Sequence, residues 1–180
     1  MAPIRLNPEA DAEVVWSQRL DPARAVLRNI PLPESGFRFG DIVLNDGAAT
    51  GHRKLDDREV PVFNCLGLMQ ASQFSTWVID VEFQEAPDSN LAAVERLGEL
   101  ATARDLAAED WSTSIRILCK ACSEGSPAAE HDHDSSSDRR HRVAIAAPDS
   151  EQAQRLVEDW EAHTGSVTVL AFELVSSAPG

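Results

Sequence analysis

The sequence predicts an α+β protein with a ferredoxin-like βαββαβ core, that is, an antiparallel sheet with two helices on one face, and an N-terminal extension of helices and a β-hairpin. Two observations lead to this prediction. Between residues 75 and 175, segments with the two-residue period of strands and segments with the 3.6-residue period of helices alternate in the order strand, helix, strand, strand, helix, strand. The first 35 residues instead show the apolar spacing of short helices.

The length of 180 residues is that of one ordinary domain, with room for an appendage. We therefore expect a helical extension over residues 1–35 and a single α+β domain over residues 36–180. Within that domain the predicted parts are a β-hairpin extension at 36–72, the ferredoxin-like core at 75–175, and a long hairpin loop at 120–140.

The N-terminal extension is predicted to contain two short helices. Residues 8–20 place four apolar side chains on roughly one side of a helix, namely Val14, Val15, Trp16 and Leu20. A second helix would begin with Asp21 as its N-cap and Pro22 at its first position, and it would end before Pro31.

The hairpin extension is predicted from two segments rich in β-branched and aromatic residues, 36–47 and 59–69. The first ends in the turn dipeptide Asp46-Gly47, and the polar residues 49–59 between the segments are expected to form a loop. Cys65 lies in the second segment, where we expect it to be an ordinary buried core residue.

The core elements follow from periodicity and from helix start and stop signals. The predicted strands are residues 75–83, 112–122, 141–147 and 166–175, and the predicted helices are residues 89–106 and 150–164. Ser89 is the expected N-cap of the first helix. Asp149 or Ser150 is the expected N-cap of the second helix, which Gly165 should end.

The connection between the two middle strands carries the clearest chemical signal. It holds Cys119 and Cys122 as a CxxC pair, followed by His131 and His133 as an HxH pair. Thiolates and imidazoles are the ligands that zinc prefers, and four of them complete a tetrahedron. The sequence therefore predicts a structural zinc site on these four residues. Further residues that would serve as alternative ligands, or would orient the imidazoles, are His141, Asp132 and Asp134.

Two other interpretations of this segment stay open. Cys119 is in phase with Ile115 and Ile117, which suits a small buried residue, and the acidic and serine-rich run after it is typical of a solvated loop. Alternatively the CxxC pair is a thiol redox pair. The pair is predicted to follow a strand, however, and not to begin a helix, where a thiolate would be stabilised.

Charge and composition limit the class of function. The formal net charge is −14, and the isoelectric point is near 4.6. A polyanion such as nucleic acid requires clustered Lys and Arg, so nucleic acid and anionic membrane surfaces are not expected partners. The charge suits solubility, or else a basic partner or a cation.

No apolar run approaches the roughly 20 residues that span a bilayer, and the N-terminus has no apolar signal segment. Three cysteines, an odd number, favour a reducing compartment over a disulfide framework. We therefore expect a cytoplasmic protein.

Together these features predict a non-enzymatic zinc-binding adaptor or regulatory module that acts through a protein partner, with a homo-oligomer as a further option. No catalytic residue is predicted. The alternatives are a zinc-dependent enzyme with an open coordination site, in which Glu130, Asp132 or Asp134 acts as base, and a metal carrier or sensor.

Overall fold

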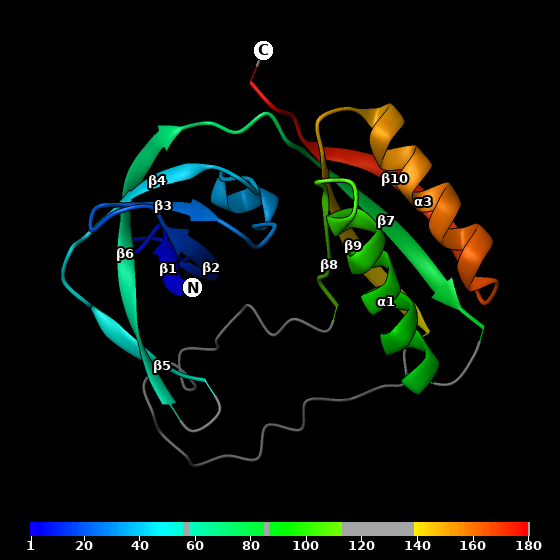
Figure 1. The fold of residues 1–180 in the computed structure, drawn as a ribbon, viewed down its shortest axis with the longest axis horizontal. Helices are drawn as coiled ribbons and strands as arrows, with labels where there is room; N and C mark the ends of the chain where they lie inside the picture. Colours follow the sequence, from blue (N-terminus) through cyan, green and yellow to red (C-terminus); the bar gives the residue numbers. More distant parts are fainter. Residues whose placement is uncertain (56–57, 85–86, 113–138, 180) are drawn as a thin grey trace.

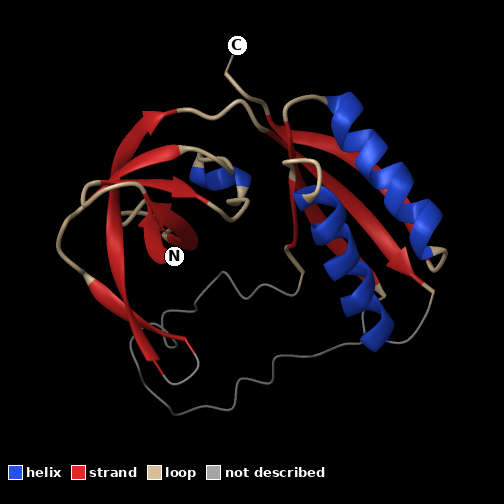
Figure 2. Cartoon of the chain, in the orientation of Figure 1, coloured by secondary structure: helices blue, strands red, loops and turns tan. Residues whose placement is uncertain are grey.

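The structure is a computed structural model that describes residues 1–55, 58–84, 87–112 and 139–179. The described chain forms two units that lie side by side: an N-terminal β-barrel and a second sheet with two helices (Figure 1). Among the described residues, strands make up most of the regular structure, and the two α-helices belong to the second unit (Figure 2).

The barrel has five strands and closes on itself. Its strands are β1 (Ala2–Leu6), β2 (Glu13–Arg19), β3 (Arg24–Leu27), β4 (Ile42–Asn45) and β6 (Arg58–Gln70). Neighbouring strands pair antiparallel in the order β1-β2-β3-β4-β6, and a parallel pairing of β1 with β6 closes the ring. A further strand, β5 (Gly51–Leu55), forms a hairpin with the first part of β6.

The interior of the barrel is apolar. Its buried residues are Ala2, Ile4, Leu6, Val15, Ala25, Leu27, Val43, Phe63 and Cys65. Cys65 is 6% exposed, which confirms the prediction that it is a core residue, and burial raises the pKa of its thiol. Every strand of the ring supplies at least one of these buried residues. Closing the barrel therefore buries side chains that a two-stranded hairpin would leave exposed to water.

The predicted N-terminal helices are wrong. Residues 13–19 form β2 and residues 24–27 form β3, because Val15 and Ser17 alternate into the barrel and Val14 and Trp16 face the other way. Asp21 does accept hydrogen bonds from two backbone N–H groups, those of Ala23 and Arg24, but it does so in the turn between the two strands. The polar segment predicted as a loop at 49–59 also contains a strand, β5.

The second unit contains β7 (Ser75–Phe83), α1 (Pro87–Thr102), β8 (Ala107–Asp110), β9 (Arg140–Ala147), α3 (Ser150–Thr164) and β10 (Val167–Ser176). Its four strands pair antiparallel in the order β10-β7-β9-β8.

The predicted fold class, a ferredoxin-like βαββαβ core with a helical and β-hairpin extension, is therefore wrong for this protein. The chain is mostly β, and its N-terminal half is a closed five-stranded barrel joined to a second sheet. The barrel was missed because its closing contact pairs Ile4 with Phe63, and local periodicity does not report pairing over such a distance.

Individual elements of the second unit agree better with the sequence pattern. The strand at 75–83, the helix at 150–164 and the strands near 141–147 and 166–175 lie where they were predicted, within one residue at each end. Asp149 caps α3 by accepting from the backbone N–H of Gln152 at 2.8 Å, and this hydrogen bond lowers the pKa of the Asp149 carboxyl. Gly165 ends α3 with a φ of 66°.

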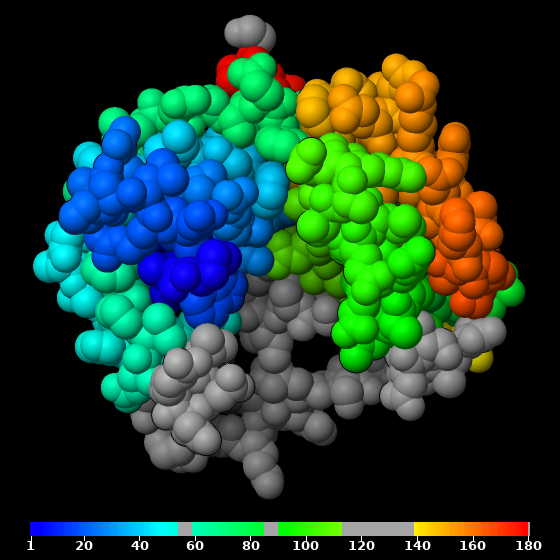
Figure 3. Space-filling view, in the orientation of Figure 1, coloured from blue at the N-terminus to red at the C-terminus, as the bar shows by residue number. Residues whose placement is uncertain are grey.

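Both faces of the second sheet are covered by other parts of the chain. Alternate residues of β9, Val143 and Ile145, share a core with α1 and α3, including the fully buried Trp160. The residues between them, Ala144 and Ala146, pack instead against Ile30 of the barrel unit. The space-filling view shows the barrel, in blue and cyan, touching the second unit along their shared border (Figure 3).

Polar contacts fix this border in place. The Glu109 carboxylate of β8 accepts hydrogen bonds from the Asn29 side chain at 2.6 Å and from the Ile30 backbone N–H at 2.9 Å. The Trp111 indole Nε1 donates to the Ile30 carbonyl at 3.2 Å. These contacts hold Asn29 and Ile30 of the barrel unit against the end of β8.

In the described part of the chain, no helix has the length and apolar character that crossing a membrane requires.

Candidate functional site

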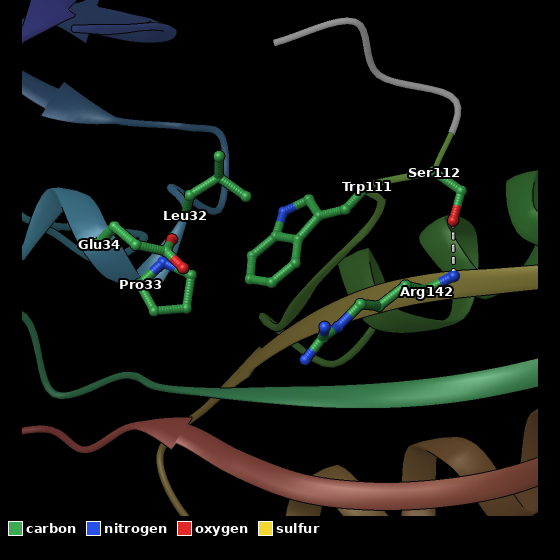
Figure 4. Close-up of a pocket in the computed structure, with 6 residues that line it drawn as sticks. All are labelled: Leu32, Pro33, Glu34, Trp111, Ser112 and Arg142. Atoms are coloured by element: carbon green, nitrogen blue, oxygen red, sulfur yellow. Dashed lines mark hydrogen bonds between the residues drawn. The ribbon is translucent and has the colours of Figure 1, made fainter. Parts of the chain in front are cut away.

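A cleft opens where the barrel meets the end of β8 and the start of β9 (Figure 4). Its volume is about 330 Å³, and its walls are formed by Leu32, Pro33, Glu34, Trp111, Ser112 and Arg142. In Figure 4, Leu32, Pro33 and Glu34 form one side of the cleft, and Trp111 and Arg142 lie opposite them. A short 3-10 helix, η1 (Pro33–Ser35), supplies two of these residues.

The Trp111 side chain is held in a fixed orientation. Its indole N–H donates to the Ile30 carbonyl, and its backbone N–H donates to the Arg142 carbonyl at 2.9 Å. The ring packs beside Ile30 in the small core between the two units. An aromatic ring that is anchored at its polar edge and half-buried can offer its remaining surface to a ligand at little entropic cost.

A hydrogen-bonded group of side chains lies behind the cleft. Asp110 accepts from the Ser112 backbone N–H at 2.8 Å, and its other carboxylate oxygen lies 2.7 Å from Nδ1 of His141. The Ser112 hydroxyl accepts from the Arg142 backbone N–H at 2.7 Å. The His141 ring also meets the edge of Phe83, with the ring centroids 5.0 Å apart. These contacts fasten the end of β8 to the start of β9.

A second hollow adjoins the cleft. It has a volume of about 270 Å³ and is lined by Asp80, Ser112, Arg140, His141, Arg142 and Leu170. Because Ser112 and Arg142 line both spaces, the cleft and this hollow together border the start of β9.

The cationic groups along the cleft and the hollow already have acidic neighbours. Arg140 pairs with Glu82 at 3.3 Å, and Arg142 pairs with Glu173 at 3.0 Å and lies 4.0 Å from Asp80. By contrast, Glu34 is exposed and forms no ion pair within the described residues. The arrangement is therefore better suited to a cation than to an anion, which would have to displace a carboxylate from an arginine.

The four predicted zinc ligands, Cys119, Cys122, His131 and His133, lie outside the described residues, as do Asp132 and Asp134. The zinc site thus stays a prediction. His141 is described, and it is paired with Asp110 and packed on Phe83. Among the residues that the structure describes, no group of three or more His, Cys, Asp or Glu side chains is arranged to hold a metal ion.

Sequence analysis missed the cleft itself. None of the local patterns described above singled out Glu34 or Trp111. Arg142 was not singled out either. The walls of the cleft come from segments about 80 positions apart in the chain, as the Asn29–Glu109 contact illustrates, and no local pattern links them.

Comparisons with known proteins do not identify a family for this chain. No protein-family model matches the chain, and a search of curated proteins finds no match either. One solved structure is similar: a hypothetical protein from Neisseria gonorrhoeae, 12% identical in sequence, with 99% of this chain and 95% of that chain covered and a TM-score of 0.38. A likeness this distant carries no argument about function.

Proposed function

We propose that the protein is a non-enzymatic adaptor or regulatory module that binds a basic segment of a partner protein in the cleft between the barrel and the second sheet. The observation that carries the proposal is the cleft wall itself. It places the half-buried face of Trp111 opposite Glu34, whose carboxylate has no ion-pair partner among the described residues, with the apolar Leu32 and Pro33 beside it.

This combination suits a lysine or arginine side chain. The cation can lie over the indole face while the carboxylate neutralises its charge, and the aliphatic stem can contact Leu32 and Pro33. A cation–π contact of this kind contributes about 0.5–2 kcal/mol, depending on how far the pair is removed from water. The net charge of −14 supports the same class of ligand, because it attracts basic segments over long distances.

The hydrogen-bonded group behind the cleft supports binding and not turnover. The Ser112 hydroxyl accepts from the backbone of Arg142, and the His141 ring is engaged by Asp110 and Phe83. In these positions the two side chains join β8 to β9 and keep the cleft wall rigid, which lowers the entropic cost of binding.

The test is a titration of the full chain with an arginine- and lysine-rich peptide, measured by calorimetry, in the wild type and in Glu34→Lys. We expect the substitution to weaken binding at least about tenfold, because it replaces an attraction with a repulsion at the cleft. Added salt should weaken the wild-type interaction as well.

The matched control is Glu9→Lys, which makes the same change of charge at an exposed position of the loop between β1 and β2. It should weaken binding less than about threefold, because only the long-range attraction changes. Equal effects of the two substitutions would show that the peptide responds to net charge alone. Absence of binding by the wild type would contradict the proposal outright.

A further inference from the structure

Besides the cleft, the edge strand β10 is a second candidate surface for binding a partner. Within the described residues, β10 pairs only with β7, so its other side offers backbone N–H and C=O groups that no described strand occupies. It has 10 residues, longer than the usual 5–6. A long open edge is a template for pairing with another strand unless the protein protects it.

The opposite edge of the same sheet, β8, is protected against such pairing. β8 has only four residues, and its Glu109 side chain is bonded to Asn29 and Ile30 of the barrel. By comparison, β10 carries one charged residue, Glu173, no proline, and two half-exposed leucines, Leu170 and Leu174.

The open part of β10 is its second half. Near the start of the strand, the Val169 backbone N–H donates to the Glu161 side chain of α3 at 3.1 Å, so this donor is occupied. Two irregularities in the pairing with β7 then enclose the regular stretch Ala171–Leu174. Beyond the strand, the Ala178 backbone N–H donates to the Ser75 hydroxyl, which returns the chain to the start of β7.

We propose that β10 pairs antiparallel with β10 of a second copy of this chain, across a two-fold axis close to Phe172 and Glu173. Two copies of the four-stranded sheet then form one continuous sheet, and both open edges are satisfied in a single closed contact.

The charge on β10 favours a second copy of the chain as its partner. Two chains with a net charge of −14 repel each other in general, but Arg142 neutralises the only carboxylate of β10 at 3.0 Å. The strand thus presents an apolar, locally neutral surface. A basic partner strand would find no free carboxylate on β10, whereas an identical strand brings matching leucines. This inference does not depend on the cleft.

The experiment is sedimentation velocity of the full chain across the micromolar range, for the wild type and for Leu174→Lys. Leu174 does not line the cleft, and its half-exposed side chain tolerates a lysine in the monomer. We expect a reversible dimer whose dissociation constant rises at least about tenfold in the variant. The control is Leu66→Lys on β6 of the barrel, where the leucine is 61% exposed, and it should leave the dissociation constant unchanged.

Hydrogen exchange of the wild type at low and high concentration locates the contact. Amides of residues 170–175 should exchange more slowly as the concentration rises. A chain that stays monomeric throughout would overturn the proposal, as would a dimer that Leu66→Lys weakens as much as Leu174→Lys or one that protects a different segment.

Discussion

Replacement of Trp160 by alanine is expected to lower the free energy of unfolding by about 3–5 kcal/mol. Trp160 is fully buried between α3 and the second sheet, where its ring meets Phe83 edge-on. The indole N–H also donates to the Ala93 carbonyl of α1 at 2.8 Å. The alanine variant would leave a large cavity and a buried carbonyl without its donor, and the two losses add.

Urea unfolding, followed by circular dichroism, measures this effect. Trp160→Phe is the matched variant: it keeps most of the apolar volume but loses the N–H, so we expect a smaller loss of about 1–2 kcal/mol. If the alanine variant lost less than about 1 kcal/mol, Trp160 would not hold the helices on the sheet as described.

Replacement of Glu109 by alanine is expected to cost about 2–4 kcal/mol, the second largest effect. The carboxylate accepts hydrogen bonds from the Asn29 side chain and the Ile30 backbone, and Ile30 is 1% exposed. Its removal leaves both donors without this acceptor at the border between the barrel and the sheet. Because the two units would then separate more easily, proteolysis should also cut the chain near this border.

Glu99→Ala is the control for Glu109→Ala. Glu99 is an exposed residue of α1 whose described partner is Arg96, three positions earlier, and its loss should change stability by less than about 0.5 kcal/mol. Equal effects of the two substitutions in urea unfolding would mean that Glu109 contributes no more than a surface charge. The border would then rest on its apolar contacts and on the hydrogen bond from Trp111 to Ile30.

Elements with a strong, uninterrupted period were predictable from the sequence. The strand at 75–83 alternates because Ile79 and Val81 face the helices, and the helix at 150–164 has an aspartate before its first residue and a glycine after its last. In these segments the local preference and the final environment agree, so the pattern alone was sufficient.

The N-terminal strands were not predictable in the same way. Residues 13–19 place Val14, Val15 and Trp16 consecutively, and a helix with one apolar side accounts for such a run as easily as a strand does. The strand form is favoured by β6, whose residues Phe63 and Asn64 lie more than 40 positions further along the chain and pair with β1 to close the barrel. Tertiary closure therefore overrides a weak local preference.

Local sequence patterns did not predict the candidate site either. Glu34 and Trp111 line one cleft because hydrogen bonds hold the barrel segment that carries Ile30 against β8 and against Trp111 itself. The net charge of −14 was the one sequence property that pointed to the same ligand class, since it favoured a basic partner. It gave no position for that partner on the molecule.

The most direct test of the proposed function is nuclear magnetic resonance of the four tryptophan indole N–H groups during titration with a lysine- and arginine-rich peptide. The Trp111 signal can be assigned from its loss in Trp111→Phe. The account predicts that the Trp111 signal shifts as the peptide saturates, while that of the fully buried Trp160 stays in place. A peptide that binds without moving the Trp111 signal would show that the cleft is not where a basic segment binds.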